Sequence, residues 1–212
     1  MKPDYIICHS KYVLDIAMSF GWKAGARYTN LRDVKHLNSV HFIDIDWKNY
    51  DYDRHLNAVR EKRPALTVAR DILNAANLDE ILREAEVLGR YCETVIVVPK
   101  DPALMAEPRL SVPCMFRLGY SVPTRYGGTE IPTTFFTGPV HLLGGRPDVQ
   151  RELARQMDVQ SVDGNRLTLD AKFGDYFDGQ RFRPHPEGGY RRCVTDSIRN
   201  VRALWEVETD HD

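Results

Sequence analysis

The chain has 212 residues, of which 42% are hydrophobic and 28% are charged, and its formal net charge at pH 7 is −1. These values are typical of a globular protein with a real core, and they exclude disordered, collagenous and broadly basic proteins. The sequence contains neither an apolar run long enough to span a membrane nor the apolar stretch of a signal peptide, which predicts a cytoplasmic protein.

Seven short apolar runs, each of strand length and each closed by Pro, Gly or Asp, recur along the chain. In chain order they cover residues 5–8, 40–45, 66–69, 95–98, 116–122, 140–143 and 159–162. An eighth strand is expected within residues 24–31. Apolar residues at helical spacing lie between several of these runs, over residues 12–20, 78–88 and 147–157. This alternation of strand and helix predicts a parallel sheet covered by crossover helices.

A closed barrel is favoured over an open sheet because no G-x-G-x-x-G turn follows the first strand, as it usually does in dinucleotide-binding sheets. We therefore predict a compact TIM-like (β/α)₈ barrel over residues 1–170. A basic C-terminal extension, residues 171–212, is expected to pack on this barrel. The length of the chain suits one trimmed barrel.

The cysteines are far apart in the sequence and form no C-x-x-C pair, which argues against a structural zinc and against a disulfide scaffold. They are expected to be buried thiols: Cys8, Cys92, Cys114 and Cys193. No His-rich metal motif is present either. We expect neither a metal nor a cofactor.

Aspartates stand at the carboxyl ends of three predicted strands, which is where parallel αβ proteins place their active sites. Asp44 and Asp46 close the second run on one face of the strand, Asp71 follows the third run, and Asp163 follows the last. Each aspartate alone has an ordinary explanation as a helix cap or turn residue. Their occurrence at three strand ends favours a functional site, because a buried carboxylate is costly without a partner or a role.

Other residues near the same strand ends complete the candidate site. Two of these residues also have a structural explanation. His141 lies within a strand, where a histidine is often a core residue. Gly144 belongs to a Gly-Gly turn, which is either a tight connection or a phosphate-binding turn. The further candidates for substrate binding are Asp44, His9, Ser10, Gly119, Ser121, His141, Gly144 and Asn165.

The C-terminal extension interleaves aromatic and basic side chains. Basic residues suit phosphates and aromatic residues suit stacked bases, as a single-stranded or flipped base requires. The alternative is that the aromatic residues pack on the barrel while the charges stay solvated. The candidate nucleic-acid-binding residues are Lys172, Tyr176, Arg181, Arg183, Arg191 and Arg192.

Three segments in order, LGYSVP, PVHLLGGRPDV and VQSVDGN, resemble the last three strand regions of the tRNA-guanine transglycosylase superfamily. The resemblance is specific over residues 118–165 and implies that Asp163 is a nucleophile. The FIDID and TVARD segments resemble the strands whose aspartates hold the incoming and outgoing base, which implies these roles for Asp46, or alternatively Asp44, and for Asp71.

Three departures from that superfamily narrow the resemblance to one of its branches. The zinc site of three cysteines and a histidine and the Ser-Gly-Gly-Phe base loop have no counterpart, and the chain is shorter. The sequence is therefore similar to the short DNA-acting branch, which comprises the DNA 7-deazaguanine transglycosylases of phages and bacteria and related base-excising proteins. This resemblance implies a role in DNA modification or phage defence.

The leading hypothesis is an enzyme that breaks the N-glycosidic bond of a base in DNA through an aspartate nucleophile. If a free base attacks the intermediate, the enzyme is a transglycosylase; if water attacks, it is a glycosylase and hence a hydrolase. The alternatives are a barrel enzyme acting on a small phosphorylated metabolite and a non-catalytic nucleic-acid-binding module. The hypothesis predicts that Asp46, Asp71 and Asp163 converge on one cavity, and that the pKa of at least one carboxyl is raised.

Overall fold

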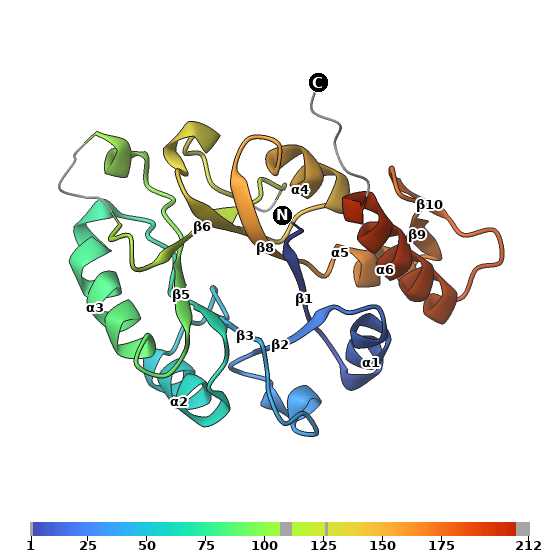
Figure 1. Ribbon diagram of the computed structural model, residues 1–212, viewed down its shortest axis with the longest axis horizontal. Helices are drawn as coiled ribbons and strands as arrows, with labels where there is room; N and C mark the ends of the chain where they lie inside the picture. Colours follow the sequence, from blue (N-terminus) through green and yellow to red (C-terminus); the bar gives the residue numbers. More distant parts are fainter. Residues whose placement is uncertain (1, 107–111, 126, 207–212) are drawn as a thin grey trace.

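The computed structural model describes residues 2–106, 112–125 and 127–206 (Figure 1). Eight parallel strands form a closed barrel in which each strand pairs with the next along the chain and the last pairs with the first. The strands are β1 (Asp4–Cys8), β2 (Lys23–Arg27), β3 (Phe42–Asp44), β4 (Leu66–Val68), β5 (Thr94–Val97), β6 (Arg117–Ser121), β7 (Pro139–Leu143) and β8 (Asp158–Asp163). The predicted TIM-like barrel is confirmed, with β2 as the eighth strand.

Helices cover the barrel only in part. They are α1 (Lys11–Ser19), α2 (Tyr52–Lys62), α3 (Leu78–Leu88), α4 (Pro147–Leu153) and α5 (Arg166–Ala171). In the described parts of three connections, 3₁₀ turns stand where a helix would follow the strand: η1 (Leu31–Val34), η3 (Pro102–Met105) and η5 (Thr133–Phe135). A further 3₁₀ turn, η2 (Ala75–Asn77), leads into α3. These short connections let a chain of 212 residues close a complete barrel.

Side chains fill the barrel interior, as in other TIM-like barrels. The ring of Phe42 lies 5.4 Å from the ring of His141, and both residues are fully buried. Gly25 leaves room for this packing, because a Cβ atom there would lie 2.6 Å from Cys8 Sγ and 3.3 Å from Phe42. Packed side chains therefore fill the barrel below the carboxyl ends of its strands.

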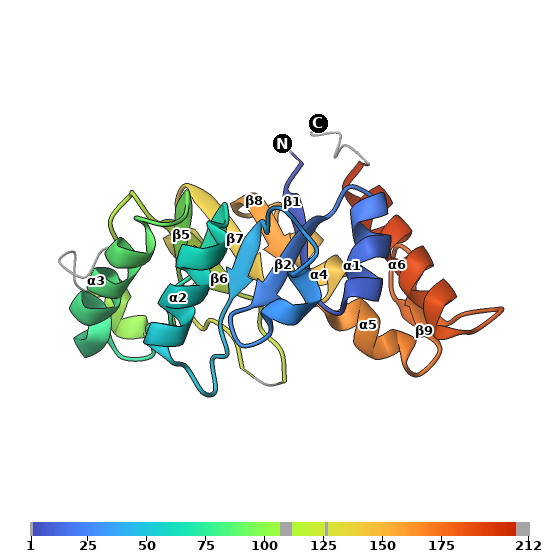
Figure 2. The same cartoon turned by 90° about the horizontal axis from the view of Figure 1, so that it is seen from below.

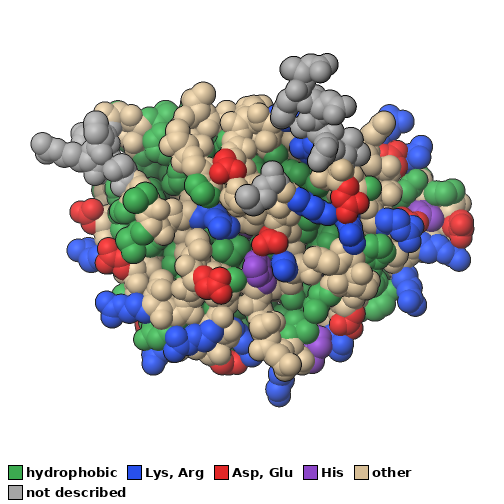
Figure 3. Space-filling view, in the orientation of Figure 1, with side chains coloured by type: hydrophobic (Ala, Val, Ile, Leu, Met, Phe, Trp, Pro, Cys, Tyr) green, Lys and Arg blue, Asp and Glu red, His purple; other side chains and the backbone are tan. Residues whose placement is uncertain are grey.

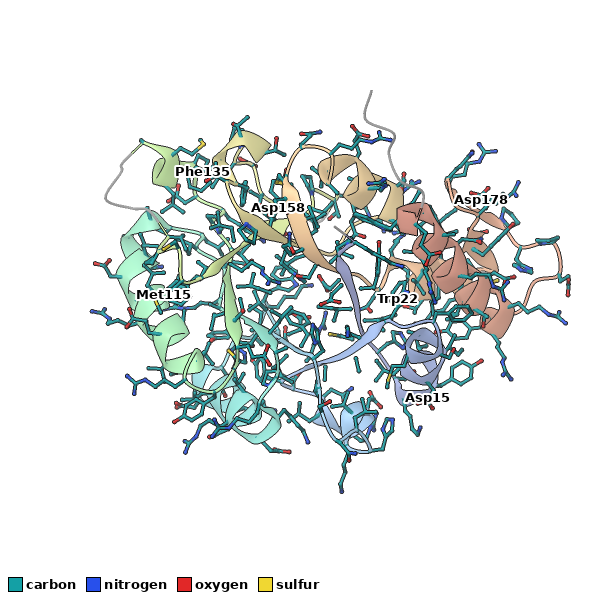
Figure 4. The ribbon with its side chains drawn as sticks, viewed as in Figure 1. Asp15, Trp22, Met115, Phe135, Asp158 and Asp178 are labelled. Atoms are coloured by element: carbon teal, nitrogen blue, oxygen red, sulfur yellow. The ribbon has the colours of Figure 1, made fainter. Side chains whose placement is uncertain are left out.

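The C-terminal extension consists of a hairpin and a long helix: β9 (Asp175–Phe177), β10 (Phe182–Pro184) and α6 (Tyr190–Glu206). Helix α6 packs against α1, α4, α5 and β9. The ring of Tyr5 lies 5.1 Å from that of Trp22 and 5.7 Å from that of Trp205 on α6. Trp22 lies between the first strands and α6 in Figure 4, whereas Asp178, in the hairpin turn, lies at the outer edge.

The candidate site and a mixed charged surface lie at opposite ends of the barrel. The strands begin at the end of the barrel that is uppermost in Figure 2, and their carboxyl ends point the opposite way. Figure 3 looks onto the amino-terminal end and shows acidic and basic side chains interspersed there. The candidate site lies at the other end.

The structure bears on two predictions, the burial of the cysteines and the absence of a membrane-spanning segment. Cys193 is buried and Cys8 and Cys92 are partly buried, but Cys114 is exposed, so the prediction of four buried thiols is wrong for Cys114. Cys114 lies in the exposed segment of residues 113–115, shortly before β6. Within the described part of the chain, no helix has the length and apolar character needed to cross a membrane.

Candidate active site

Three aspartates from different strands line one pocket at the carboxyl end of the barrel. Asp44 ends β3, Asp71 follows β4 and Asp163 ends β8, and the pocket that they share has a volume of about 260 Å³. Ser121, at the end of β6, and Gly144, after β7, also line it. Parallel strands bring their carboxyl ends together, so residues far apart in the sequence meet here. We refer to this space as the acid pocket.

Asp44 has an environment that favours its neutral form. Its side chain is 18% exposed; its Oδ1 accepts a hydrogen bond of 2.8 Å from the Ile45 amide, and its Oδ2 lies 3.6 Å from Arg27 Nε. Burial, and next the negative charge of Asp163, raise the pKa of Asp44 from 3.8 to about 7. Near neutral pH, Asp44 is therefore present in both its protonated and its ionised forms.

Asp163 is held in place by its backbone and by its carboxylate. The Gly144 amide donates a 3.0 Å hydrogen bond to Asp163 Oδ1. Gln150 Nε2 donates to the backbone carbonyls of Asp163, at 2.8 Å, and of Gly144, at 2.7 Å. Gln150, on α4, thus links the two loops that follow β7 and β8. This arrangement fixes the direction in which the second carboxylate oxygen of Asp163 points.

A chain of polar side chains runs through the barrel interior to Asp163. Arg117 Nη1 donates to Ser161 Oγ at 3.0 Å, and Ser161 Oγ lies 2.8 Å from His141 Nδ1. Ser161 Oγ accepts from Arg117, and the histidine tautomer decides whether Ser161 also donates to His141 Nδ1 or accepts a second hydrogen bond from it. His141 Nε2 lies 3.4 Å from Asp163 Oδ1, too long for a good hydrogen bond but close enough for an electrostatic contact. The fully buried His141 therefore contacts the carboxylate of Asp163 from the barrel interior.

Asp71 is paired with a lysine that the sequence alone does not single out. Lys100 Nζ lies 2.7 Å from Asp71 Oδ2, and the two side chains are 19% and 14% exposed. Lys100 follows β5 and also lines the acid pocket. The pocket therefore contains a cation beside its three carboxyl groups. Cys8 lies near them too, and burial, with the charges of Asp44 and Asp163, raises the pKa of its thiol well above 9.0, which keeps it neutral.

Asp46 is not brought to the acid pocket. Strand β3 ends at Asp44, so the alternation that would place both aspartates on the inner face stops before Asp46. The carboxylate of Asp46 instead accepts a 3.2 Å hydrogen bond from the Lys48 amide, as expected of a turn residue. Asp44 occupies the place that the sequence pattern assigned first to Asp46.

The other predicted site residues fall in three places. Ser121 and Gly144 line the acid pocket, and Gly119 and His141 lie in the barrel wall and interior beneath it. A second, larger cavity of about 1000 Å³ adjoins the acid pocket and shares Thr124 and Gly145 with it. Its lining includes His9, Ser10 and Asn165. The candidate residues thus form two adjoining spaces rather than one.

The predicted nucleic-acid-binding residues are dispersed over the extension and the large cavity. Lys172 lines the large cavity. Arg183 pairs with Asp178 at 2.9 Å and Arg192 pairs with Glu187 at 3.3 Å, so neighbouring carboxylates offset both charges. Tyr176 packs against His185, with 4.7 Å between the ring centroids, and Arg181 and Arg191 are exposed.

No three His, Cys, Asp or Glu side chains among residues 2–106, 112–125 and 127–206 come together as a metal site. The fold and the site define a TIM-like barrel protein with an acidic cluster at the carboxyl end of its strands. A family model with the description "Family of unknown function (DUF6610)" matches residues 17–206, and the chain belongs to this family. The comparison with curated proteins gave no match.

Proposed function

We propose that the protein cleaves the N-glycosidic bond of a nucleobase in DNA, with Asp163 as the nucleophile. The observation that carries this proposal is the pairing of two carboxyl groups of different character in one pocket. Asp163 is held by the Gly144 amide, whereas the pKa of Asp44 is raised to about 7. Glycoside cleavage with a covalent intermediate requires such a pair, one group ionised to attack and one able to hold a proton.

The first step forms one bond and breaks one bond. A carboxylate oxygen of Asp163 attacks the anomeric carbon of the sugar, and the electron pair of the glycosidic bond leaves with the base nitrogen. Protonated Asp44 donates its proton to the departing base. The products of this step are an aspartyl ester to the sugar, a neutral base and an ionised Asp44.

The second step reverses the first with another nucleophile. Ionised Asp44 takes a proton from a water molecule, or from the ring nitrogen of an incoming free base, and that nucleophile attacks the anomeric carbon. The ester bond breaks and its electron pair returns to Asp163. Attack by water gives base excision, and attack by a free base gives exchange.

Asp71 and Lys100 are suited to hold the base. The Asp71 carboxylate accepts hydrogen bonds and the Lys100 ammonium donates them, and both groups line the acid pocket. Together they can pair with the donor and acceptor groups on the edge of a flipped base. The resemblance of the LGYSVP, PVHLLGGRPDV and VQSVDGN segments to tRNA-guanine transglycosylases supports the same assignment of Asp163.

A second candidate function is the conversion of a small phosphorylated metabolite. The cavity of about 1000 Å³ beside the acid pocket, with arginines in its lining, supports this alternative. The two functions differ in the product that they release. Only the first yields a free base and an abasic or exchanged position in DNA.

The decisive experiment incubates the protein with DNA carrying modified and unmodified bases and measures free base and alkali-labile sites. Asp163→Asn should lower turnover by roughly four to six powers of ten, because it removes the attacking group, while DNA binding stays near that of the wild type. Asp46→Asn is the matched control, since Asp46 lies outside the acid pocket, and its activity should be unchanged.

Two outcomes would contradict the proposal. If Asp163→Asn keeps full activity while Asp44→Asn or Asp71→Asn abolishes it, the nucleophile is misassigned. If no base is released from any DNA and all variants behave as the wild type, the glycosidic function is wrong, and the metabolite enzyme or the binding module takes its place.

A further inference from the structure

The large cavity beside the acid pocket has a chemical character of its own. It lies over the carboxyl ends of β1 and β2 and beside α5, and it shares Thr124 and Gly145 with the acid pocket. Its volume of about 1000 Å³ is at the upper end of the range for sites that hold drug-sized ligands, about 300–1000 Å³. A ligand that fills both spaces would therefore be larger than a single base and sugar.

Basic side chains dominate the lining of this cavity. Asp33 is the acidic residue among the described residues that line it. The basic residues are Arg27, Arg125, Arg146, Arg166 and Lys172. The formal net charge of the whole chain is −1, so this concentration of cations is local. An anionic ligand fits such a lining, whereas the acid pocket next to it fits an uncharged group.

Two of the arginines are held in position by the same aromatic ring. The guanidinium carbons of Arg146 and Arg166 lie 5.9 Å and 6.0 Å from the centre of the Phe182 ring on β10. Arg166 also makes hydrogen bonds of 2.6 Å and 2.8 Å to Asp170, and Arg146 makes one of 3.0 Å to Asp148. These contacts occupy only some of the five N–H donors of each guanidinium, so both keep donors for a ligand.

Lys172 completes the basic side of the cavity from the end of α5. It makes no ion pair with any residue in the described part of the chain, so its ammonium group is available. Burial, and next the charge of Lys172, lower the pKa of His9, which also lines the cavity. His9 is therefore neutral near pH 7 and adds a hydrogen-bonding group rather than a charge.

We propose that this cavity binds the phosphodiester backbone of a single nucleic-acid strand, with phosphates on Arg146, Arg166 and Lys172. The adjoining base of that strand then enters the acid pocket through the opening shared at Gly145. Phosphates prefer the fixed, forked donors of arginine, and a single strand can turn its base away from its backbone. This inference rests on the proposed function, and of the predicted nucleic-acid-binding residues it keeps only Lys172, so that the phosphate contacts lie in the large cavity rather than on the hairpin and α6.

The test measures binding of a fluorescent 12-residue single-stranded DNA by anisotropy across a range of salt concentrations. The Asp163→Asn background prevents turnover during the measurement. In that background, Arg146→Ala with Lys172→Ala should weaken binding at least tenfold. The slope of log affinity against log salt should fall by about 1.4, since each lost phosphate contact on a single strand contributes about 0.7.

The matched control removes the same charge from the extension, as Arg181→Ala with Arg191→Ala, both of which are exposed. This control should change the affinity less than twofold. A greater loss in the control than in the cavity variant would overturn the inference and place the strand on the extension. Circular dichroism and melting temperature verify that both double variants fold, and Arg146→Lys with Lys172→Arg should restore most of the affinity.

Two further measurements separate the alternatives. Competition by free phosphates tests whether the cavity binds a strand or a small phosphorylated ligand, and base release tests the proposed function separately from strand binding. Inorganic phosphate and pyrophosphate should compete only at millimolar concentrations; displacement at micromolar concentrations would overturn the strand assignment in favour of a small phosphorylated ligand. If the strand binds through the cavity but no DNA base is released, the glycosidic function fails and this inference stands. If base is released and the cavity variants bind normally, this inference alone fails.

Discussion

The environment of Asp44 predicts a substitution that stabilises the fold and removes activity. Asp44→Asn keeps the acceptor for the Ile45 amide but removes the carboxyl whose charged form is disfavoured by burial and by Asp163. It also removes the contact with Arg27 at 3.6 Å, whose arginine side chain is 50% exposed. Exposed pairs of this kind contribute less than about 1 kcal/mol. The variant should therefore gain more stability than it loses.

The size and pH dependence of that gain follow from the pKa of Asp44. The folded state holds the Asp44 proton up to about pH 7, whereas the unfolded chain loses it near the ordinary pKa of 3.8. Below that value both states are protonated and the carboxyl carries no penalty. As the pH rises from about 4 to about 7 the unfolded state ionises first, so the folded state loses stability, by at most about 4 kcal/mol at about 1.4 kcal/mol per pH unit. The pKa of about 7 already includes the favourable contact with Arg27, so only the partial exposure of Asp44 reduces this figure, to an expected gain of about 2 kcal/mol at pH 8.

Urea unfolding at pH 4, 6 and 8 measures this effect directly. The free energies of unfolding of wild type and Asp44→Asn should coincide at pH 4 and diverge as the pH rises, with the variant more stable at pH 8. Asp46→Asn is the control and should follow the wild type, because the Asp46 carboxylate caps a turn. Equal pH dependence in wild type and Asp44→Asn, or a less stable variant at pH 8, would refute the reasoning. In the same variant, base release should fall because the proton donor is gone.

Two other substitutions probe the loop and the interior beneath the acid pocket. Gly145→Ala should lower the free energy of unfolding by about 2–4 kcal/mol, because its φ is +89° and a Cβ would lie 2.4 Å from Val122 Cγ1. Gly174→Ala, with φ +83° and open space around it, should lose only about 1 kcal/mol in the same urea titration, and an equal loss in both would contradict the steric argument. His141→Phe should lower kcat about tenfold to a hundredfold with little change in KM, and should alter the pH profile of kcat, because Asp163 loses the imidazole nitrogen that lies 3.4 Å from its Oδ1. A wild-type profile in that variant would show that His141 serves only the core.

The barrel is predictable from the sequence because parallel strands are buried on both faces and therefore appear as short β-branched runs. Strand β2, KAGAR, contains no β-branched residue and is therefore hard to recognise. At its centre only glycine fits, because a Cβ atom at Gly25 would lie 2.6 Å from Cys8 Sγ. Helix α2 is also hard to predict because most of its residues are polar. One of its buried positions is His55, which is bonded to Thr67 at 2.8 Å in place of an apolar contact.

The candidate site is predictable in outline and not in its pairings. The strand-end rule brings Asp71 and Asp163 together, but the choice between Asp44 and Asp46 depends on the exact residue at which β3 ends. The contact between Lys100 and Asp71 joins two connections that have no pattern in common. The sequence order of charges in the extension likewise does not reveal which arginines are paired with acids.

The contrast between Asp44 and the other aspartates argues for a chemical role of the acid pocket. Asp101 accepts hydrogen bonds from two backbone amides, and Asp170 is bonded twice by Arg166, so the charge of each has good partners. Asp44 has one backbone donor, a distant arginine and the repulsion of Asp163. An asparagine in its place would satisfy the same amide without a penalty. A fold that keeps the destabilising carboxyl gains nothing structurally from it, and a site that must give and take a proton near neutral pH gains the group that it needs.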